Sequence, residues 1–169
     1  IIDNPLVTFN NGKYMLIEFQ PFLLPDGYDK HLYELKMSGI TPIIAHPERY
    51  KAFQEDSDIA RRLIDSGCLI QIDAGSIIGT FGKKPFITAI NLLKSNMCHI
   101  LGSDAHNDRR NFCLKEALKK IDNIIGVSYD YLVNKNPSDV LMGNEVIVPE
   151  INDLDSNNWF KSFIDLLKK

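Results

Sequence analysis

Short apolar runs alternate with amphipathic stretches along the first 125 residues of the chain. The apolar runs have the length and hydrophobicity of strands buried on both faces, and each is followed by a stretch with helical periodicity. The predicted strands are 14–19, 41–46, 69–73 and 99–104, and the predicted helices are 28–38, 57–67, 85–93 and 112–126. This βαβαβαβα order predicts an α/β fold whose parallel sheet is either open or part of a (β/α) barrel.

The pattern changes after residue 128. Short helices are predicted at 128–133 and 138–142, separated by 134–137, and a short strand at 145–148. Residues 151–158 are polar and typical of a linker, whereas Trp159 to Leu167 form a wide apolar stripe at helical spacing. We therefore divide the chain into residues 1–150, a βα domain, and residues 151–169, a linker with a terminal amphipathic helix.

Residue types that bind metals follow three of the predicted strands. Glu18, His46, Asp104 and His106 all lie at or just beyond the carboxyl end of an apolar run. The carboxyl ends of parallel strands meet at one rim, so we expect these four side chains to lie together. Carboxylate and imidazole ligands suit Zn, Mn or Fe, and mixed sites of this kind favour hydrolysis. Asp73 ends the remaining strand and is a further candidate.

Each of these residues also has an ordinary structural interpretation. His46 could cap a helix or pack in the core, Asp104 and His106 could form a surface turn, and Glu18 could lie on a sheet edge. Their joint occurrence at strand ends favours the metal site over three unrelated features. His31 and His99 are predicted to be non-catalytic, because one lies on an exposed helix and the other begins a strand.

Arginines stand close to both histidine clusters. Arg49 follows His46 by three residues, and Arg109 and Arg110 follow His106. A guanidinium group binds phosphate or carboxylate with two parallel hydrogen bonds and stabilises charge that develops at phosphorus. The pattern therefore favours a phosphorylated or otherwise anionic substrate. The alternative is a set of solvent-exposed ion pairs with neighbouring acidic residues.

The segment 74–84 contains three glycines but does not have the spacing of a P-loop. The pair Gly82-Lys83 would require glycine at position 77, which is isoleucine. We predict an irregular loop, either a flexible part of the active site that brings Ser76 or Lys83 near substrate, or a plain connector.

Composition narrows the classes of function. The chain has 169 residues, a net charge of −3 and 44% hydrophobic residues, which is typical of a soluble globular domain. It contains no long basic run and no apolar stretch of about 18 residues, so nucleic-acid binding and membrane insertion are not expected. Its three cysteines form no CxxC pair, which favours a reducing, cytoplasmic location.

Four segments in this order resemble the bacterial capsular-polysaccharide tyrosine phosphatases of the PHP (polymerase and histidinol phosphatase) superfamily. The segments are Leu16-Ile17-Glu18-Phe19, Ile43-Ile44-Ala45-His46-Pro47-Glu48-Arg49-Tyr50, Ala74-Gly75-Ser76 with Gly79-Thr80-Phe81-Gly82-Lys83, and Ser103-Asp104-Ala105-His106-Asn107. The resemblance covers residues 6–143.

The resemblance implies a distorted (β/α) barrel, of which this chain is the later part, with two or three divalent metals. Manganese is the metal most expected, and iron or zinc are alternatives. It implies that Glu18, His46, Asp104 and His106 bind the metals and that Arg49 and Arg110 bind the phosphoryl group. The implied substrate is phosphotyrosine on a bacterial tyrosine kinase that controls capsule or exopolysaccharide synthesis.

The chain departs from the family pattern at its start. Family members begin with a His-x-His strand and a further acidic ligand, and neither precedes Glu18 here. The first residue is Ile1, so we expect that an N-terminal portion is missing, that the isolated fragment is inactive, and that its open edge favours a homo-oligomer. The alternative functions are a PHP-type hydrolase of a small phosphomonoester and a non-catalytic assembly module.

Overall fold

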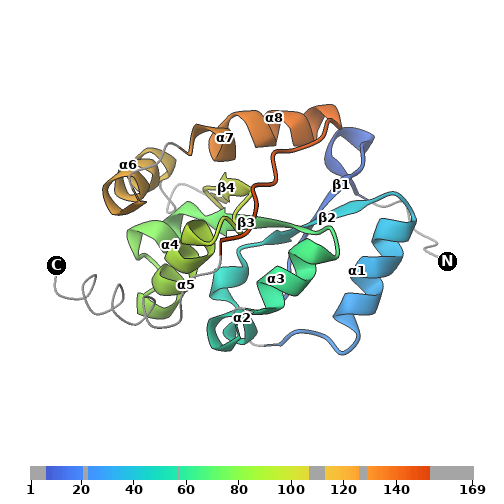
Figure 1. Ribbon diagram of the computed structural model, residues 1–169, viewed down its shortest axis with the longest axis horizontal. Coiled ribbons are helices and arrows are strands. Elements are labelled where there is room, and N and C mark those ends of the chain that lie inside the picture. Colours follow the sequence, from blue (N-terminus) through green and yellow to red (C-terminus); the bar gives the residue numbers. More distant parts are fainter. Residues whose placement is uncertain (1–6, 21–22, 57, 107–112, 126–128, 153–169) are drawn as a thin grey trace.

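The core of the molecule is a four-stranded parallel sheet (Figure 1). A computed structural model describes residues 7–20, 23–56, 58–106, 113–125 and 129–152. The strands are β1 (Tyr14–Ile17), β2 (Thr41–Ala45), β3 (Leu69–Asp73) and β4 (Ile100–Gly102). They lie in the sheet in their sequence order, and each neighbouring pair is parallel. All four carboxyl ends therefore point the same way.

Helices connect the strands and cover the sheet. The helical elements are η1 (Phe9–Asn11), α1 (Tyr28–Met37), η2 (Pro47–Arg49), α2 (Lys51–Glu55), α3 (Asp58–Asp65), α4 (Ala74–Ile78), α5 (Lys83–Lys94), α6 (Leu114–Ile125), α7 (Asp130–Val133) and α8 (Lys135–Met142). In the part of the chain that the structure describes, none of them has both the length and the apolarity to span a bilayer.

Alternate residues of each strand enter two separate hydrophobic clusters. Ile44, Ile70 and Ile72 belong to the large cluster, which also contains buried residues of the connecting helices. Ile43 and Ile100 belong to a small cluster on the opposite face, together with Val140 of α8. The two-residue period of a strand produces this division, and it explains why the strands are apolar throughout.

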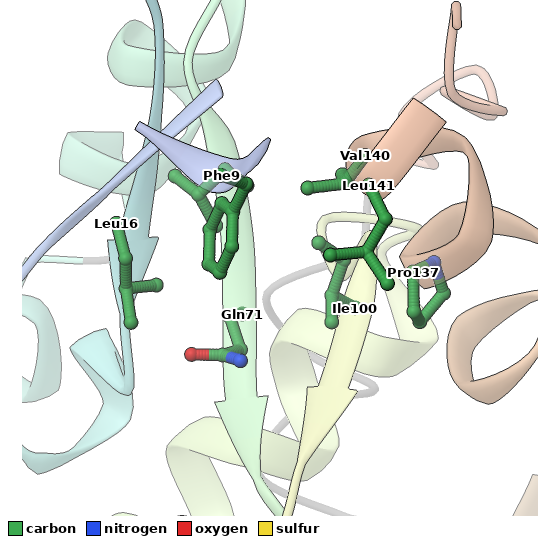
Figure 2. Close-up of a pocket in the computed structure, with 8 residues that line it drawn as sticks. Phe9, Leu16, Gln71, Ile100, Pro137, Val140 and Leu141 are labelled. Carbon is green, nitrogen blue, oxygen red and sulfur yellow. The ribbon is translucent and has the colours of Figure 1, made fainter. Parts of the chain in front are cut away.

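The small cluster leaves an apolar cavity of about 200 Å³ between the sheet and two helical elements (Figure 2). Its walls include Phe9 of η1, Leu16 of β1 and Leu141 of α8, with Gln71 and Ile100 on the sheet side. Leu16 and Leu141 are both exposed. This face is therefore covered less completely than the face that carries the large cluster.

The α/β class, the four strands and the alternation of strands and helices are confirmed. The prediction of a loop over 74–84 is wrong at both ends, because residues 74–78 form α4 and α5 begins at Lys83, whereas residues 79–82 lie outside the helices. Asp73 precedes the helix and its Oδ1 accepts the backbone N–H of Gly75 at 2.8 Å, which is an N-cap hydrogen bond. The aspartate that was considered as a metal ligand is thus also a helix cap.

Two predictions beyond residue 128 are also wrong. Residues 134–137 do not separate two helices, since α8 already begins at Lys135 and includes Pro137. Proline is tolerated there because the first turn of a helix needs no intrahelical N–H donor. Residues 145–148 form neither a strand nor a helix. The predicted terminal helix and most of the 151–169 segment lie outside the described residues.

Candidate active site

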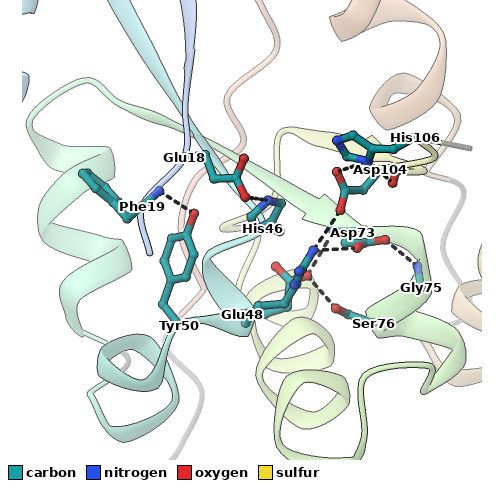
Figure 3. A network of polar contacts seen from close by, with 11 residues as sticks. Glu18, Phe19, His46, Glu48, Tyr50, Asp73, Gly75, Ser76, Asp104 and His106 are labelled. Atoms are coloured by element: carbon teal, nitrogen blue, oxygen red, sulfur yellow. Dashed lines mark hydrogen bonds and ion pairs between the residues drawn. The ribbon is translucent and has the colours of Figure 1, made fainter. Parts of the chain in front are cut away.

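The candidate ligands lie at the carboxyl end of the sheet, as predicted (Figure 3). His46 directly follows β2 with φ of 34°, and Asp104 follows β4 with φ of 46°. Left-handed backbone at a residue that is not glycine costs about 1 kcal/mol or more, and such residues are concentrated at functional sites. The strand predicted to reach residue 104 therefore ends at Gly102, and the chain turns sharply to present Asp104.

Glu18 and His46 form the first pair. Nε2 of His46 lies 3.2 Å from Oε1 of Glu18, and the histidine side chain is only 6% exposed whereas Glu18 is 64% exposed. Burial lowers the pKa of His46, as does the positive charge of Arg49, against the opposing effect of Glu18 and Asp104. The ring is therefore a neutral imidazole at neutral pH, the form that binds metals.

The His46 ring is fixed by an aromatic neighbour. It packs edge-on against the buried Tyr50, with 5.6 Å between ring centroids. The Tyr50 hydroxyl accepts the backbone N–H of Phe19 at 2.9 Å, which ties the η2 turn to the residue beside Glu18. Nδ1 of His46 is buried and has no hydrogen-bond partner among the described residues.

Asp104 and His106 form the second pair. Nδ1 of His106 lies 3.5 Å from Oδ1 of Asp104 and 2.8 Å from its backbone oxygen. The His106 side chain is 67% exposed, so its ring is far less constrained than that of His46. The two-residue spacing thus brings both side chains to one face of the chain, as the sequence predicts.

Arg49 lies between the carboxylates of two different strand ends. Its Nη1 donates to Oδ2 of Asp104 at 2.8 Å and to Oδ2 of Asp73 at 3.5 Å. Its guanidinium carbon lies over the ring of Phe81, 4.6 Å from the centroid. The side chains of Arg49 and Asp104 are each 19% exposed, so this charge pair is largely shielded from solvent. Arg110, the second predicted arginine, and Arg109 lie outside the described residues.

Glu48 is the residue of this site that the sequence did not reveal. It is completely buried, and its Oε1 accepts the Ser76 hydroxyl at 2.6 Å and the Asp73 backbone N–H at 3.1 Å. Burial is the main cause that raises the pKa of Glu48 to about 8. In a sequence, a glutamate next to an arginine is typical of a solvent-exposed ion pair. Only the fold shows that Glu48 links η2 to the end of β3.

The donor types fit a divalent metal, but the described residues do not form a closed metal cage. Among them, no three His, Cys, Asp or Glu side chains converge on one point. Figure 3 shows the candidate ligands in two pairs, Glu18 with His46 and Asp104 with His106. In addition, Nη1 of Arg49 donates to one carboxylate oxygen of Asp104. The neutral His46 ring, whose Nε2 lies 3.2 Å from the Glu18 carboxylate, is the feature that best suits a metal ion.

Comparison with known proteins identifies the family. Residues 1–142 match the family described as capsular polysaccharide synthesis, CpsB/CapC. The chain belongs to this family. The resemblance that the sequence motifs indicated is therefore confirmed, and with it the PHP-type fold class.

Curated relatives cover most of this chain. It is 35% identical over 143 residues to tyrosine-protein phosphatase YwqE of Bacillus subtilis, which is 84% of this chain and 56% of YwqE. It is 37% identical over 156 residues to putative tyrosine-protein phosphatase CapC of Staphylococcus aureus, which is 89% of this chain and 60% of CapC. The chain thus spans less than two thirds of the length of these relatives.

A solved structure shows the same fold. The match is to a chain from the crystal structures of YwqE from Bacillus subtilis and CpsB from Streptococcus pneumoniae, which are described as unique metal-dependent tyrosine phosphatases. The TM-score is 0.81 at 32% sequence identity, over 89% of this chain and 61% of the other.

Proposed function

We propose that the protein hydrolyses phosphotyrosine in a metal-dependent reaction. The observation that carries this proposal is the position of Arg49, which bridges Asp73 and Asp104 beside the Glu18–His46 pair at the carboxyl end of the sheet. An arginine that is largely shielded from solvent and next to potential metal ligands suits the binding of a phosphoryl dianion. The names of the curated relatives support the same reaction.

Glu18, His46, Asp104 and His106 would hold two or three divalent ions, with manganese the first choice and iron or zinc as alternatives. When bound, such ions supply a hydroxide nucleophile near neutral pH and offset charge on the phosphoryl oxygens. The neutral state of His46 leaves one ring nitrogen unprotonated and available as a ligand. His106 beside Asp104 is placed to hold or pass on a proton at its exposed ring.

Arg49 and Arg110 would bind the phosphoryl group. Nη1 of Arg49 already binds two carboxylates, so a phosphoryl oxygen would take the place of the more exposed one, Asp104. Asp73 is 1% exposed and would keep its contact, which holds the guanidinium in place during the exchange. Tyrosine is a moderately good leaving group with a pKa of about 10, so a strong general acid is not essential.

The proposed substrate is a phosphotyrosine-bearing tyrosine kinase that controls capsule or exopolysaccharide synthesis. The capsular family and the phosphatase names of the relatives support this choice. We place the reaction in the cytoplasm, because Cys68, Cys98 and Cys113 are free thiols and a reducing compartment preserves them.

The test uses the full-length protein that carries this sequence, manganese, and a phosphotyrosine peptide. Arg49→Ala and Arg110→Ala should each lower kcat/KM by about 10²-fold or more, the loss typical of one donor to the transition state. The metal content, measured by mass spectrometry of the purified protein, should stay nearly unchanged. Arg62→Ala is the matched control, because Arg62 is 61% exposed and pairs with Asp56 on the surface.

Three outcomes would contradict the proposal. Wild-type kinetics in both arginine variants would make these residues ordinary surface charges. Rapid hydrolysis of small phosphomonoesters with no action on the peptide would identify the alternative PHP-type hydrolase. Neither metal nor activity in the wild-type protein would favour an assembly module.

A further inference from the structure

We infer that Phe81 is a positioning residue for Arg49 and fixes the plane in which the guanidinium group meets a phosphoryl oxygen. The inference rests on the proposed function, since it concerns the arginine that would bind the phosphoryl group. Phe81 follows α4 in the segment that was predicted as a loop. No role in the reaction follows from its sequence position alone.

The Phe81 ring and the two carboxylates contact the Arg49 guanidinium group at different atoms. The guanidinium carbon lies 4.6 Å from the centre of the Phe81 ring, whereas Nη1 donates to Asp73 and Asp104. The N–H donors of a guanidinium group lie in its plane, so a ring that covers one side leaves the edge available for hydrogen bonds. Removal of the Phe81 ring would let the Arg49 guanidinium group rotate, so that its N–H donors no longer face the phosphoryl oxygen.

The position of the ring is itself built into the start of α4. A Cβ atom at Gly75 would lie 2.8 Å from Cε2 and 3.3 Å from Cζ of Phe81, so only glycine gives the ring its place. The N–H of Gly75 also donates to Asp73, the second carboxylate on Arg49. One glycine therefore sets the position of two neighbours of the arginine.

Phe81 is not needed to fill the hydrophobic core. It is half-buried and belongs to neither hydrophobic cluster of the described residues, whereas Phe86 packs against the large one. The segment that carries Phe81 begins at Gly79 with φ of 94° and ends at Gly82 with φ of 92°. These left-handed residues let the chain leave α4 and enter α5 with the Phe81 ring turned toward Arg49.

The decisive experiment compares Phe81→Leu with Phe81→Tyr in the full-length protein. Phe81→Leu should lower kcat on a phosphotyrosine peptide by about 10-fold, less than the loss of the donor itself, because a misplaced donor still carries its charge. KM should change by less than about 2-fold, because Arg49 still attracts the dianion in the ground state. Phe81→Tyr keeps the ring and should restore kcat.

Gly75→Ala tests the same contact from the other side. Its Cβ must displace the ring, so the variant should reproduce the loss in kcat even though alanine favours a helix by about 1 kcal/mol. The double variant Gly75→Ala/Phe81→Leu should be no slower than Gly75→Ala alone, because the alanine already displaces the ring. A larger loss in Gly75→Ala than in Phe81→Leu would come from its Cβ, which also lies 3.1 Å from Oδ1 of Asp73.

Phe86→Leu is the matched control. Its ring lies 4.5 Å from Nζ of Lys120, so this variant also removes an aromatic ring from a cation, but away from Arg49. It should lower thermal stability without changing kcat. Equal kinetic losses for Phe81→Leu and Phe86→Leu, or no rescue by Phe81→Tyr, would overturn the inference.

The inference and the proposed function fail in different ways. Wild-type kcat in Phe81→Leu, in a protein that loses activity in Arg49→Ala, would overturn the role of Phe81 and leave the phosphatase intact. A wild-type protein that hydrolyses no phosphomonoester would overturn both.

Discussion

His99 shows how a single buried residue can make the whole chain sensitive to acid. Its side chain is completely buried just before β4, and its Nδ1 accepts the backbone N–H of Ile70 at 3.0 Å. Its Nε2 has no hydrogen-bond partner among the described residues. Burial lowers the pKa of His99 to about 4, because the charged ring would lose its hydration.

This pKa predicts how stability depends on pH. In the unfolded chain the pKa of a histidine is 6.5, so the folded chain binds fewer protons between pH 6.5 and about 4. The contribution of His99 to stability is therefore present above pH 6.5 and is lost as the pH falls through about 4. The difference between the two pKa values corresponds to roughly 3 kcal/mol.

His99→Asn should weaken this dependence, since the amide oxygen can accept the Ile70 N–H but does not titrate. Between pH 7 and pH 4.5, the free energy of unfolding of His99→Asn should fall by roughly 2 kcal/mol less than that of the wild type. Urea denaturation at several pH values measures this. His31→Asn is the control, because the His31 side chain is 71% exposed. An unchanged pH dependence in His99→Asn would show that other groups cause the acid sensitivity.

Individual residues also show where sequence reasoning reached its limit. His46, Asp104 and Arg49 were recognisable because strand ends collect chemistry and because their motif is specific. Glu48 was not recognisable, because its burial depends on the packing of η2 against β3. Ligand roles for the four candidate residues remain predictions.

At the scale of elements, apolar runs predicted all four strands because a buried parallel strand leaves little room for polar residues. Errors arose where one local signal competed with another. The glycines of 74–84 suggested a loop, but the Asp73 cap and the Ser76–Glu48 hydrogen bond stabilise a helix there. The run 145–148 suggested a strand, yet both backbone hydrogen-bonding groups of Ile147 pair with a side chain of α8.

That side chain is Asn136, which joins three elements. Its Nδ2 donates to the backbone oxygens of His99 at 2.8 Å and Ile147 at 2.9 Å, and its Oδ1 accepts the Ile147 N–H at 2.8 Å. Asn136 is completely buried. It therefore holds α8 and the segment around Ile147 against the start of β4.

Asn136→Ala should lower the free energy of unfolding by about 3 kcal/mol or more, because three hydrogen bonds are lost and backbone groups remain buried without partners. Asn134→Ala is the control, since Asn134 is exposed and its side chain donates to Asp130 on the surface of α7, and it should change stability by less than about 0.5 kcal/mol. Chemical denaturation measures both. If both variants change stability by similarly small amounts, water satisfies the backbone groups of His99 and Ile147 that lose their partner in Asn136→Ala.

At the scale of the whole molecule, the two faces of the sheet are protected to different degrees. In the part of the chain that the structure describes, β1 is the first strand of the sheet and pairs only with β2. Leu16 of β1 is 43% exposed at the wall of the apolar cavity, and Val7 nearby in the sequence is 87% exposed. A sheet edge with apolar side chains beside it tends to pair with another chain.

We therefore predict that the 169-residue polypeptide, expressed by itself, self-associates through the β1 edge. Sedimentation velocity at about 5 and 50 µM should show a mass above that of one chain that increases with concentration, since edge pairing is a weak bimolecular contact. Leu16→Lys should shift the distribution to monomers, because a lysine on an edge strand opposes pairing. Tyr33→Lys introduces the same charge at a 61% exposed position of α1 and should leave association unchanged. If the polypeptide is monomeric at both concentrations, or if both lysine variants dissociate it equally, the edge is not the cause, and the exposed leucine is only a local feature of the cavity wall.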